Sequence, residues 1–359
     1  MSLKKTPLFE EHLRLNAKML EFAGFEMPIT YDRYSGGMLQ EHLEVRRNLG
    51  MFDVSHMGEF WISGAGAKDF LSFVTTKDFD VSKDGRAYYC LLLKDDGGIL
   101  DDILVYRANS QKFLMVVNAS NLSKDWMHLM NYAREFDVSL EDKSAETALI
   151  ALQGPQAQHV IKEIYEGANE LAYYSFFETQ DSLIARTGYT GEDGFEIFLS
   201  PDQAVELWKR LLNLGVKPIG LGARDSLRME VGFPLYGQEL REDLWAHESL
   251  SRFALKNKKA FLGSQSLQNA PRWQPISLQG LNAKPMRSHE KIILNGEIVG
   301  EITSGSTSPS LKRGMGLGLI KADCHFEEAS IFLLESAGKQ REANFKNLPF
   351  IEAGRVKNK

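Results

Sequence analysis

The apolar positions near the start of the chain recur at roughly helical spacing over residues 8–22, which predicts a helix there. Thr6 is a suitable N-cap residue, Pro7 fits the first helical position, and Gly24 is expected to end the helix. From residue 51 to residue 117 the pattern changes to short β-rich runs separated by glycines. This middle segment is therefore predicted to form mainly sheet.

A second pattern begins near residue 147, where the runs follow the order strand, helix, strand, strand, helix. They cover residues 147–152, 154–166, 182–187, 195–199 and 202–214. This order is typical of a split β-α-β arrangement, so it predicts an α+β fold rather than a doubly wound one. After a polar linker that ends at Asn269-Ala270-Pro271, short apolar runs between residues 280 and 334 predict a small barrel or a sandwich.

The length of 359 residues allows about two to three domains, and 43% hydrophobic with 25% charged residues is typical of a globular protein with a sizeable core. A formal net charge of −6 provides no broad basic field, so no nucleic acid is expected as a partner. Cys90 and Cys324 lie far apart, which excludes a disulfide framework or a cysteine-rich zinc site and favours a reducing compartment.

No apolar run approaches the ~20 residues that span a bilayer, so no membrane association is predicted. The first residues also lack the apolar core of a signal peptide. We therefore expect a cytoplasmic protein, or one of the mitochondrial matrix if a presequence was removed.

An acidic pair lies inside a strand-like run. The sequence Asp95-Asp96-Gly97-Gly98 predicts a hairpin turn, and Asp101 and Asp102 follow it in the returning strand. Adjacent strand residues point to opposite faces, so the two do not form a carboxylate dyad, and at least one of them lies among apolar neighbours. Burying a carboxylate there costs several kcal/mol unless it is paired or protonated, which is typical of functional sites. A carboxylate that caps nearby backbone amides explains the pattern equally well.

A glycine-rich block precedes a second acidic residue. Gly188, Gly191 and Gly194 allow the backbone to lie close to a neighbour or a ligand, and Glu196 follows them in an apolar strand. A solvated acid on an edge strand is the alternative interpretation of Glu196.

A charged segment follows Gly220-Leu221-Gly222, which lacks the third glycine of a dinucleotide fingerprint. Arg224 lies near the expected start of a helix, together with other charged residues. Surface ion pairing is the default interpretation, and anion binding is the alternative.

Taken together, these blocks resemble the aminomethyltransferase, or T-protein, family of the glycine cleavage system over nearly the whole chain. Each motif is weak by itself, whereas their order and spacing are specific. The motifs are Thr6-Pro7-Leu8, Met27-Pro28, Gly50–Gly58, Gly97–Tyr106, Val116–Ala119, Leu152–Pro155, Arg186–Glu196, Gly220–Asp225, Leu235–Gln238 and Gly300–Gly305.

The resemblance implies a three-lobed α+β fold around a central folate cavity, with a small C-terminal β-barrel. It divides the chain into a discontinuous ferredoxin-like domain, a second discontinuous α+β domain and the barrel, at residues 1–52 plus 140–235, 53–139 plus 236–272, and 273–359. The implied reaction moves the methylene carbon from the aminomethyl-dihydrolipoyl arm of the H-protein to tetrahydrofolate and releases ammonia. The implied partners are the lipoylated H-protein and other components of the glycine cleavage complex, and no metal is expected.

The resemblance also assigns roles to single residues. Asp102 matches the essential acid of the family, Glu196 the acid that holds the pterin, and Arg224 the residue near the folate tail. An ionised carboxylate can accept two parallel hydrogen bonds from the pterin edge, and a guanidinium can meet the glutamate carboxylate. The other positions that match the folate-lining residues are Met57, Tyr89, Asn118, Tyr189 and Phe253.

The segment from Ala246 to Phe253 departs from the family pattern, which has a proline at the start, a glycine in the middle and a tryptophan in place of Phe253. Different contacts at the active-site wall, or a different fit to the H-protein, are therefore expected. One alternative function is that of another folate-dependent demethylase of the same family. A second, a non-catalytic folate-binding protein of iron–sulfur assembly, is disfavoured because Phe233-Pro234-Leu235-Tyr236 contains no cysteine.

Overall fold

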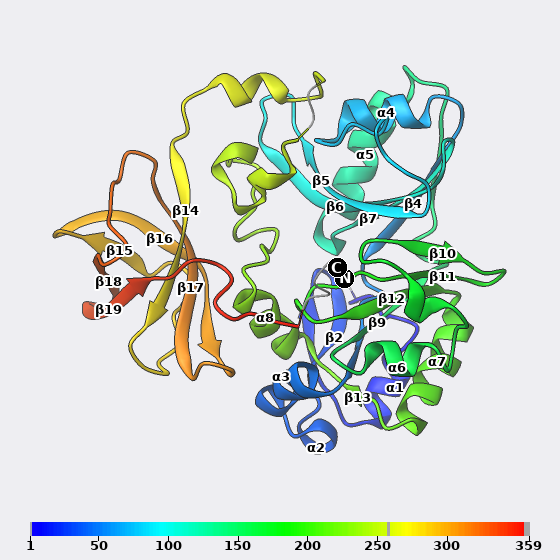
Figure 1. The fold of residues 1–359 in the computed structure, drawn as a ribbon, viewed down its shortest axis with the longest axis horizontal. Helices are drawn as coiled ribbons and strands as arrows, with labels where there is room; N and C mark the ends of the chain where they lie inside the picture. Colours follow the sequence, from blue (N-terminus) through cyan, green and yellow to red (C-terminus); the bar gives the residue numbers. More distant parts are fainter. Residues whose placement is uncertain (1, 257–258, 355–359) are drawn as a thin grey trace.

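The computed structural model describes residues 2–256 and 259–354. In Figure 1 a β-barrel lies on one side, two sheets with their helices lie on the other, and helix α8 (Leu221–Glu230) lies between them. Among the described residues, no helix has the length and apolar character needed to cross a membrane.

The first sheet has six strands and contains the central strand β12. Its strands in spatial order are β10 (Phe176–Glu178), β11 (Ser182–Ala185), β12 (Gly194–Leu199), β9 (Ala148–Gln153), β3 (Gly50–Asp53) and β13 (Lys217–Pro218). Helix α7 (Pro201–Asn213) contributes Trp208 and Leu211 to the apolar core on one face of this sheet. Ser200 caps that helix together with Gln203, and Pro201 occupies its first turn, so the predicted helix near residues 202–214 is confirmed.

The second sheet has five strands and carries the acidic pair. Its order is β5 (Arg86–Leu93), β6 (Ile99–Asn109), β7 (Lys112–Val117), β4 (Gly58–Ser63) and β8 (Ser139–Asp142). Helices α4 (Ala67–Val74) and α5 (Leu122–Ala133) pack on one face around Phe60, Phe70 and Leu129. The other face meets the first sheet through a shared core that includes Phe52, Tyr106, Leu149 and Phe198.

Six strands near the end of the chain close into a barrel in the order β14 (Trp273–Gly280), β17 (Arg313–Lys321), β16 (Glu297–Ser308), β15 (Lys291–Leu294), β18 (Ile331–Ser336) and β19 (Lys339–Phe345). The predicted α+β fold class with a C-terminal β-barrel is confirmed, and the sandwich alternative is wrong. The first sheet combines β3 with strands that follow residue 147, whereas the second sheet and the barrel each come from one continuous stretch of the chain. The exact domain boundaries stay a prediction.

The helix predicted over residues 8–22 is wrong in its second half. Helix α1 covers only Phe9–Arg14, and β1 (Lys18–Phe22) and β2 (Phe25–Thr30) form a separate hairpin that turns at Gly24. Asn16 adopts a left-handed backbone with φ 54°, which a continuing helix does not allow. The hydroxyl of Thr6 donates to the buried carboxylate of Asp53 at 2.6 Å, so it does not cap the helix.

The helix predicted over residues 154–166 is also much shorter than expected. Helix α6 covers Ala157–Ile161. It starts later than predicted because Gly154 has φ 141°, which a helix does not allow, and lies against the backbone of Asn48. The other short segments are α2 (Asp32–Ser35), α3 (Met38–Arg47) and the 3₁₀ turns η1 (Ala119–Asn121), η2 (Ala168–Glu170), η3 (Ala246–Glu248), η4 (Leu250–Ala254) and η5 (Ser264–Gln268).

Buried charges on α8 join the helix to the barrel. The guanidinium of Arg228 donates to Glu239 at 2.9 Å and to the hydroxyl of Ser304, on β16, at 2.9 Å. The carboxylate of Glu230 accepts hydrogen bonds from the hydroxyls of Ser308 and Ser310 at 2.5 and 3.0 Å. The barrel is therefore fixed against the helix by hydrogen bonds to two buried charged side chains.

The C-terminal segment after β19 returns to the first sheet, as the red trace in Figure 1 shows. The amide of Phe350 donates to the carbonyl of Glu230 at 2.9 Å, and the amide of Gly354 donates to Glu192 at 3.1 Å. This segment ties the barrel to α8 a second time.

We predict that Arg228→Met destabilises the protein by about 3–5 kcal/mol, because Glu239 would then be a buried carboxylate without its cationic partner. Urea denaturation measures this change. Arg241→Met is the matched control, because Arg241 and Asp243 form an exposed pair whose loss costs under ~1 kcal/mol. Equal losses in the two variants would contradict the prediction.

Candidate active site

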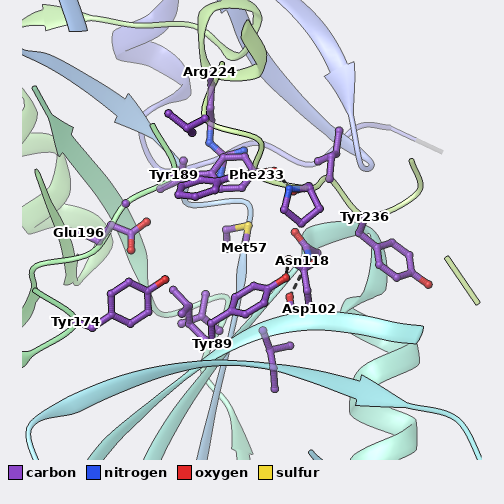
Figure 2. Close-up of a pocket in the computed structure, with 18 of the residues that line it drawn as sticks. Met57, Tyr89, Asp102, Asn118, Tyr174, Tyr189, Glu196, Arg224, Phe233 and Tyr236 are labelled. Carbon is purple, nitrogen blue, oxygen red and sulfur yellow. Dashed lines mark hydrogen bonds between the residues drawn. The ribbon is translucent and has the colours of Figure 1, made fainter. Parts of the chain in front are cut away.

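A cavity of about 580 Å³ lies among the two sheets, α8 and the C-terminal segment. All eight residues that the sequence singled out line it, although they come from elements far apart in the chain: Met57, Tyr89, Asp102, Asn118, Tyr189, Glu196, Arg224 and Phe253. Figure 2 shows Glu196 and Asp102 on opposite sides of the cavity, with Met57 between them. The volume lies within the range of ordinary small-molecule sites.

Asp102 lies on β6, where the register of the β5–β6 hairpin directs its side chain into the cavity. One carboxylate oxygen accepts a hydrogen bond from the side-chain amide of Asn118 at 2.9 Å, and the other accepts one from the Tyr89 hydroxyl at 3.1 Å. Burial raises the pKa of Asp102 to about 7, and the charge of Asp101 adds to this effect. The side chain can therefore gain or lose a proton near neutral pH.

Asp101 points to the opposite face and is fully buried. It accepts hydrogen bonds from the backbone amide of Asn118 at 3.0 Å and from the side chains of Asn118 and Asn121 at 2.9 and 2.6 Å. Each interpretation of the acidic pair thus applies to one residue, because Asp101 caps an amide and Asp102 faces the cavity. The two side chains point to opposite faces, as the alternation predicts, and both accept hydrogen bonds from the Asn118 side chain.

A third carboxyl group lies beside Asp101. Asp125, on α5, is fully buried, and its carboxyl group lies within hydrogen-bonding reach of the Asp101 carboxylate. Burial and the neighbouring Asp101 raise the pKa of Asp125, so this group is protonated at neutral pH. The protonated acid adds no further negative charge beneath Asp102.

Glu196 lies on β12, which pairs with β11 on one side and β9 on the other. The alternative of a solvated acid on an edge strand is therefore wrong. The Thr187 hydroxyl donates to its carboxylate at 2.5 Å. Burial raises the pKa of Glu196, and the Thr187 hydrogen bond and the charge of Arg224 act in the opposite direction.

The close approach expected at the glycine-rich block is to a protein side chain. A Cβ atom on Gly188 or Gly194 would lie within 2.4 Å of Gln153, whose side chain also donates to the carbonyl of Thr187 at 3.1 Å. The glycines thus let Gln153 pack beneath the strand that carries Glu196.

Arg224 lies in the first turn of α8, and its guanidinium is 4.5 Å from the centre of the Tyr189 ring. No carboxylate of the described residues forms an ion pair with it. Burial lowers the pKa of Arg224, although the group remains a cation. The default interpretation, surface ion pairing, is therefore wrong for Arg224. The neighbouring Arg228 does form ion pairs, but it is buried.

Sequence reasoning missed several lining residues. Tyr174 adopts φ 60°, an uncommon backbone for a bulky residue, and its ring reaches the cavity near Glu196 (Figure 2). Tyr236 was part of a quoted motif without being assigned a role, and Leu348 and Pro349 arrive from beyond the barrel. No local pattern marks these residues, because only the folded chain brings them together.

Comparisons with known proteins agree over the full chain. Residues 8–259 match the family described as GCVT N-terminal domain, and residues 276–352 match the glycine cleavage T-protein C-terminal barrel domain. The chain belongs to the glycine cleavage T-protein family. The similar curated proteins named aminomethyltransferase include one from Deinococcus deserti, 42% identical over 98% of both chains, and one from Thermus thermophilus, 42% identical over 97% of this chain and 99% of the relative.

A solved T-protein structure supports the same assignment. The glycine cleavage system aminomethyltransferase T from Bartonella henselae superposes with a TM-score of 0.92 at 35% identity, covering 98% of this chain and 99% of that one. The predicted three-lobed fold and the predicted family are confirmed. As a T-protein family member, the chain is a tetrahydrofolate-dependent aminomethyltransferase of the glycine cleavage system.

We predict that Asp102→Asn stabilises the protein above pH 7 by roughly 1–4 kcal/mol. The folded-state pKa of about 7 is above the ordinary 3.8, so the stability from this group is complete below pH 4 and is lost as the pH rises through 7. Urea denaturation at pH 8 and pH 5 should show a gain that shrinks toward the lower pH. The exposed control Asp181→Asn should change stability by less than about 0.5 kcal/mol at either pH.

Proposed function

We propose that this chain takes the methylene carbon from an aminomethyl-dihydrolipoyl arm on the H-protein and transfers it to tetrahydrofolate at the cavity described above. The observation that carries the proposal is that one cavity holds a carboxyl group with a near-neutral pKa, Asp102, together with a second carboxylate, Glu196, and the guanidinium of Arg224, which forms no ion pair with the described residues. Family membership supports the reaction type, and the cavity supports the assignment of roles to residues.

Two charged side chains are suited to hold the folate at opposite ends. The Glu196 carboxylate can accept parallel hydrogen bonds from the ring nitrogen and amino donors of the pterin. Arg224 can bind the carboxylate of the glutamate tail, because buried guanidinium groups favour bidentate contacts with carboxylates. The rings of Tyr189 and Phe233, which lie 5.8 Å apart at 33°, provide flat apolar surface between them.

The reaction requires proton transfer, which Asp102 is suited to perform. Two carbon–nitrogen bonds form to the folate, while the carbon–nitrogen bond to the amine and the carbon–sulfur bond to the lipoyl arm break. The two protons lost from the folate nitrogens balance those gained by the departing ammonia and the dihydrolipoyl thiol. The Asp102 carboxylate accepts a proton from a folate nitrogen and returns it to a leaving group, since its pKa is close to the working pH.

We predict that Asp102→Asn lowers the rate of ammonia release by roughly 10²–10⁴-fold, because the amide cannot transfer the proton. The assay combines the purified chain, aminomethyl-loaded H-protein and tetrahydrofolate. Asp95→Asn, in the same hairpin but exposed, is the matched control and should retain wild-type activity. No ammonia release by the wild-type chain would refute the function, whereas an Asp102→Asn variant as active as wild type would refute only the role of Asp102.

We predict that Arg224→Met raises the KM for tetrahydrofolate about tenfold or more, and leaves the KM for tetrahydropteroate, which lacks the glutamate, nearly unchanged. Glu196→Gln is the matched comparison and should weaken both substrates to the same degree, since both contain the pterin. Steady-state kinetics with each substrate measures these values. A loss of equal size for both substrates in Arg224→Met would contradict its assignment to the folate tail.

A further inference from the structure

One short turn of the chain contacts both the hydroxyl and the ring of Tyr89. Its hydroxyl oxygen lies 2.6 Å from the Ser251 hydroxyl, and its ring stacks on Phe253 with the centroids 5.5 Å apart and an interplanar angle of 21°. Ser251 and Phe253 both belong to η4 (Leu250–Ala254), which is separated from Tyr89 by more than 150 residues in sequence. These two contacts thus fix the position of the Tyr89 side chain at the cavity wall.

The hydrogen bonds at Tyr89 have one consistent direction. A tyrosine hydroxyl has a single proton, and here the ionised Asp102 carboxylate, 3.1 Å away, can only accept it. The proton between Tyr89 and Ser251 then belongs to Ser251, so the order of donation is Ser251 to Tyr89 to Asp102. Among the described side chains, only Tyr89 and Asn118 donate to the Asp102 carboxylate, and half of that support therefore depends on the orientation of the tyrosine hydroxyl.

The surroundings of Ser251 keep its hydroxyl in place. The side chain is fully buried, and its backbone amide donates to the Ser249 hydroxyl at 3.1 Å. Ser249 in turn donates to the carbonyl of Ala246 at 2.8 Å, which fixes the start of the turn. Because Ser251 is fully buried, bulk solvent does not reach its hydroxyl, and the serine is the hydrogen-bond partner of Tyr89 on this side.

We propose that Ser251 is a positioning residue for the reaction, which directs the Tyr89 hydroxyl toward Asp102, while Phe253 holds the ring of Tyr89 in the required plane. This inference rests on the proposed role of Asp102. It gives a chemical meaning to the segment from Ala246 to Phe253, which departs from the family pattern. Tyr89 acts here through its hydroxyl group in addition to lining the cavity.

The effects of Ser251 and Tyr89 on the reaction should be coupled. If Ser251 acts through Tyr89, removing its hydroxyl matters only while the Tyr89 hydroxyl is present. In Ser251→Ala the carboxylate of Asp102 receives a weaker hydrogen bond, so its charged form is less stable and the acidic limb of the kcat profile moves to higher pH. A residue with a purely structural role would change protein stability or amount without moving this limb.

The test is a double-mutant cycle with Ser251→Ala and Tyr89→Phe in the reconstituted ammonia-release assay, measured from pH 5 to pH 9. We expect Ser251→Ala to lower kcat near pH 7 by about two- to tenfold, to shift the acidic limb upward and to leave the KM for tetrahydrofolate within twofold. In the Tyr89→Phe background the same change should have no further effect on kcat. Ser251→Thr, which keeps the hydroxyl, should restore both kcat and the position of the limb.

Ser266→Ala is the matched control, because Ser266 is also a buried serine in a short 3₁₀ turn but lies outside the cavity and donates to the carbonyl of Gly263. It should leave the acidic limb in place. Additive effects of Ser251→Ala and Tyr89→Phe, or an unshifted limb in Ser251→Ala, would overturn the proposal. Neither result would affect the proposed function, which depends on the wild-type and Asp102→Asn activities alone.

Discussion

Two carboxyl groups at adjacent positions of β6 are shielded from bulk water, Asp101 completely and Asp102 except where it faces the cavity, and the surrounding side chains compensate for the lost hydration. A buried carboxylate is unstable unless hydrogen bonds or a proton compensate for lost hydration. Asn118 supplies hydrogen bonds to both Asp101 and Asp102, and its own backbone amide is held by Asp101. Asp125, being protonated, adds no further negative charge to the pair. The part of the desolvation cost that these contacts do not offset raises the pKa of Asp102 to about 7, where proton transfer is useful.

Helix α8 connects this chemistry to the barrel. Its first turn places Arg224 in the cavity, and later turns bury Arg228 and Glu230 against β16. A Cβ atom at Gly220, where the helix begins, would lie 2.3 Å from the carbonyl oxygen of Ile29, so only glycine allows the helix to start at this place. The barrel thus contributes to the site by fixing the helix that carries the guanidinium, besides delivering Leu348 and Pro349 to the cavity wall.

The sequence was sufficient where a motif is local and the backbone dictates its direction. The alternation along residues 99–106 correctly separated the faces of Asp101 and Asp102, and the motif blocks identified eight residues that line one cavity. It was insufficient where tertiary contacts override local preference. Thr6 and Pro7 suggested a longer helix, but Asp53 engages the Thr6 hydroxyl and the following residues form a hairpin. The shared use of Asn118 and the arrival of Tyr174 depend on segments whose proximity no local pattern encodes.

The segment from Ala246 to Phe253 departs from the family pattern, yet its backbone is held in place by contacts outside the cavity. Glu248 is held by Arg272, which donates to its carboxylate from the backbone amide at 2.6 Å and from the guanidinium at 3.0 and 2.7 Å. Arg272 directly precedes β14, so the start of the barrel fixes the turn that precedes η4. Ser251 and Phe253 can then differ from the usual residues while still contacting Tyr89, because the backbone beneath them is anchored elsewhere. The barrel therefore supports the cavity at two places, through α8 on the Arg224 side and through η4 on the Asp102 side.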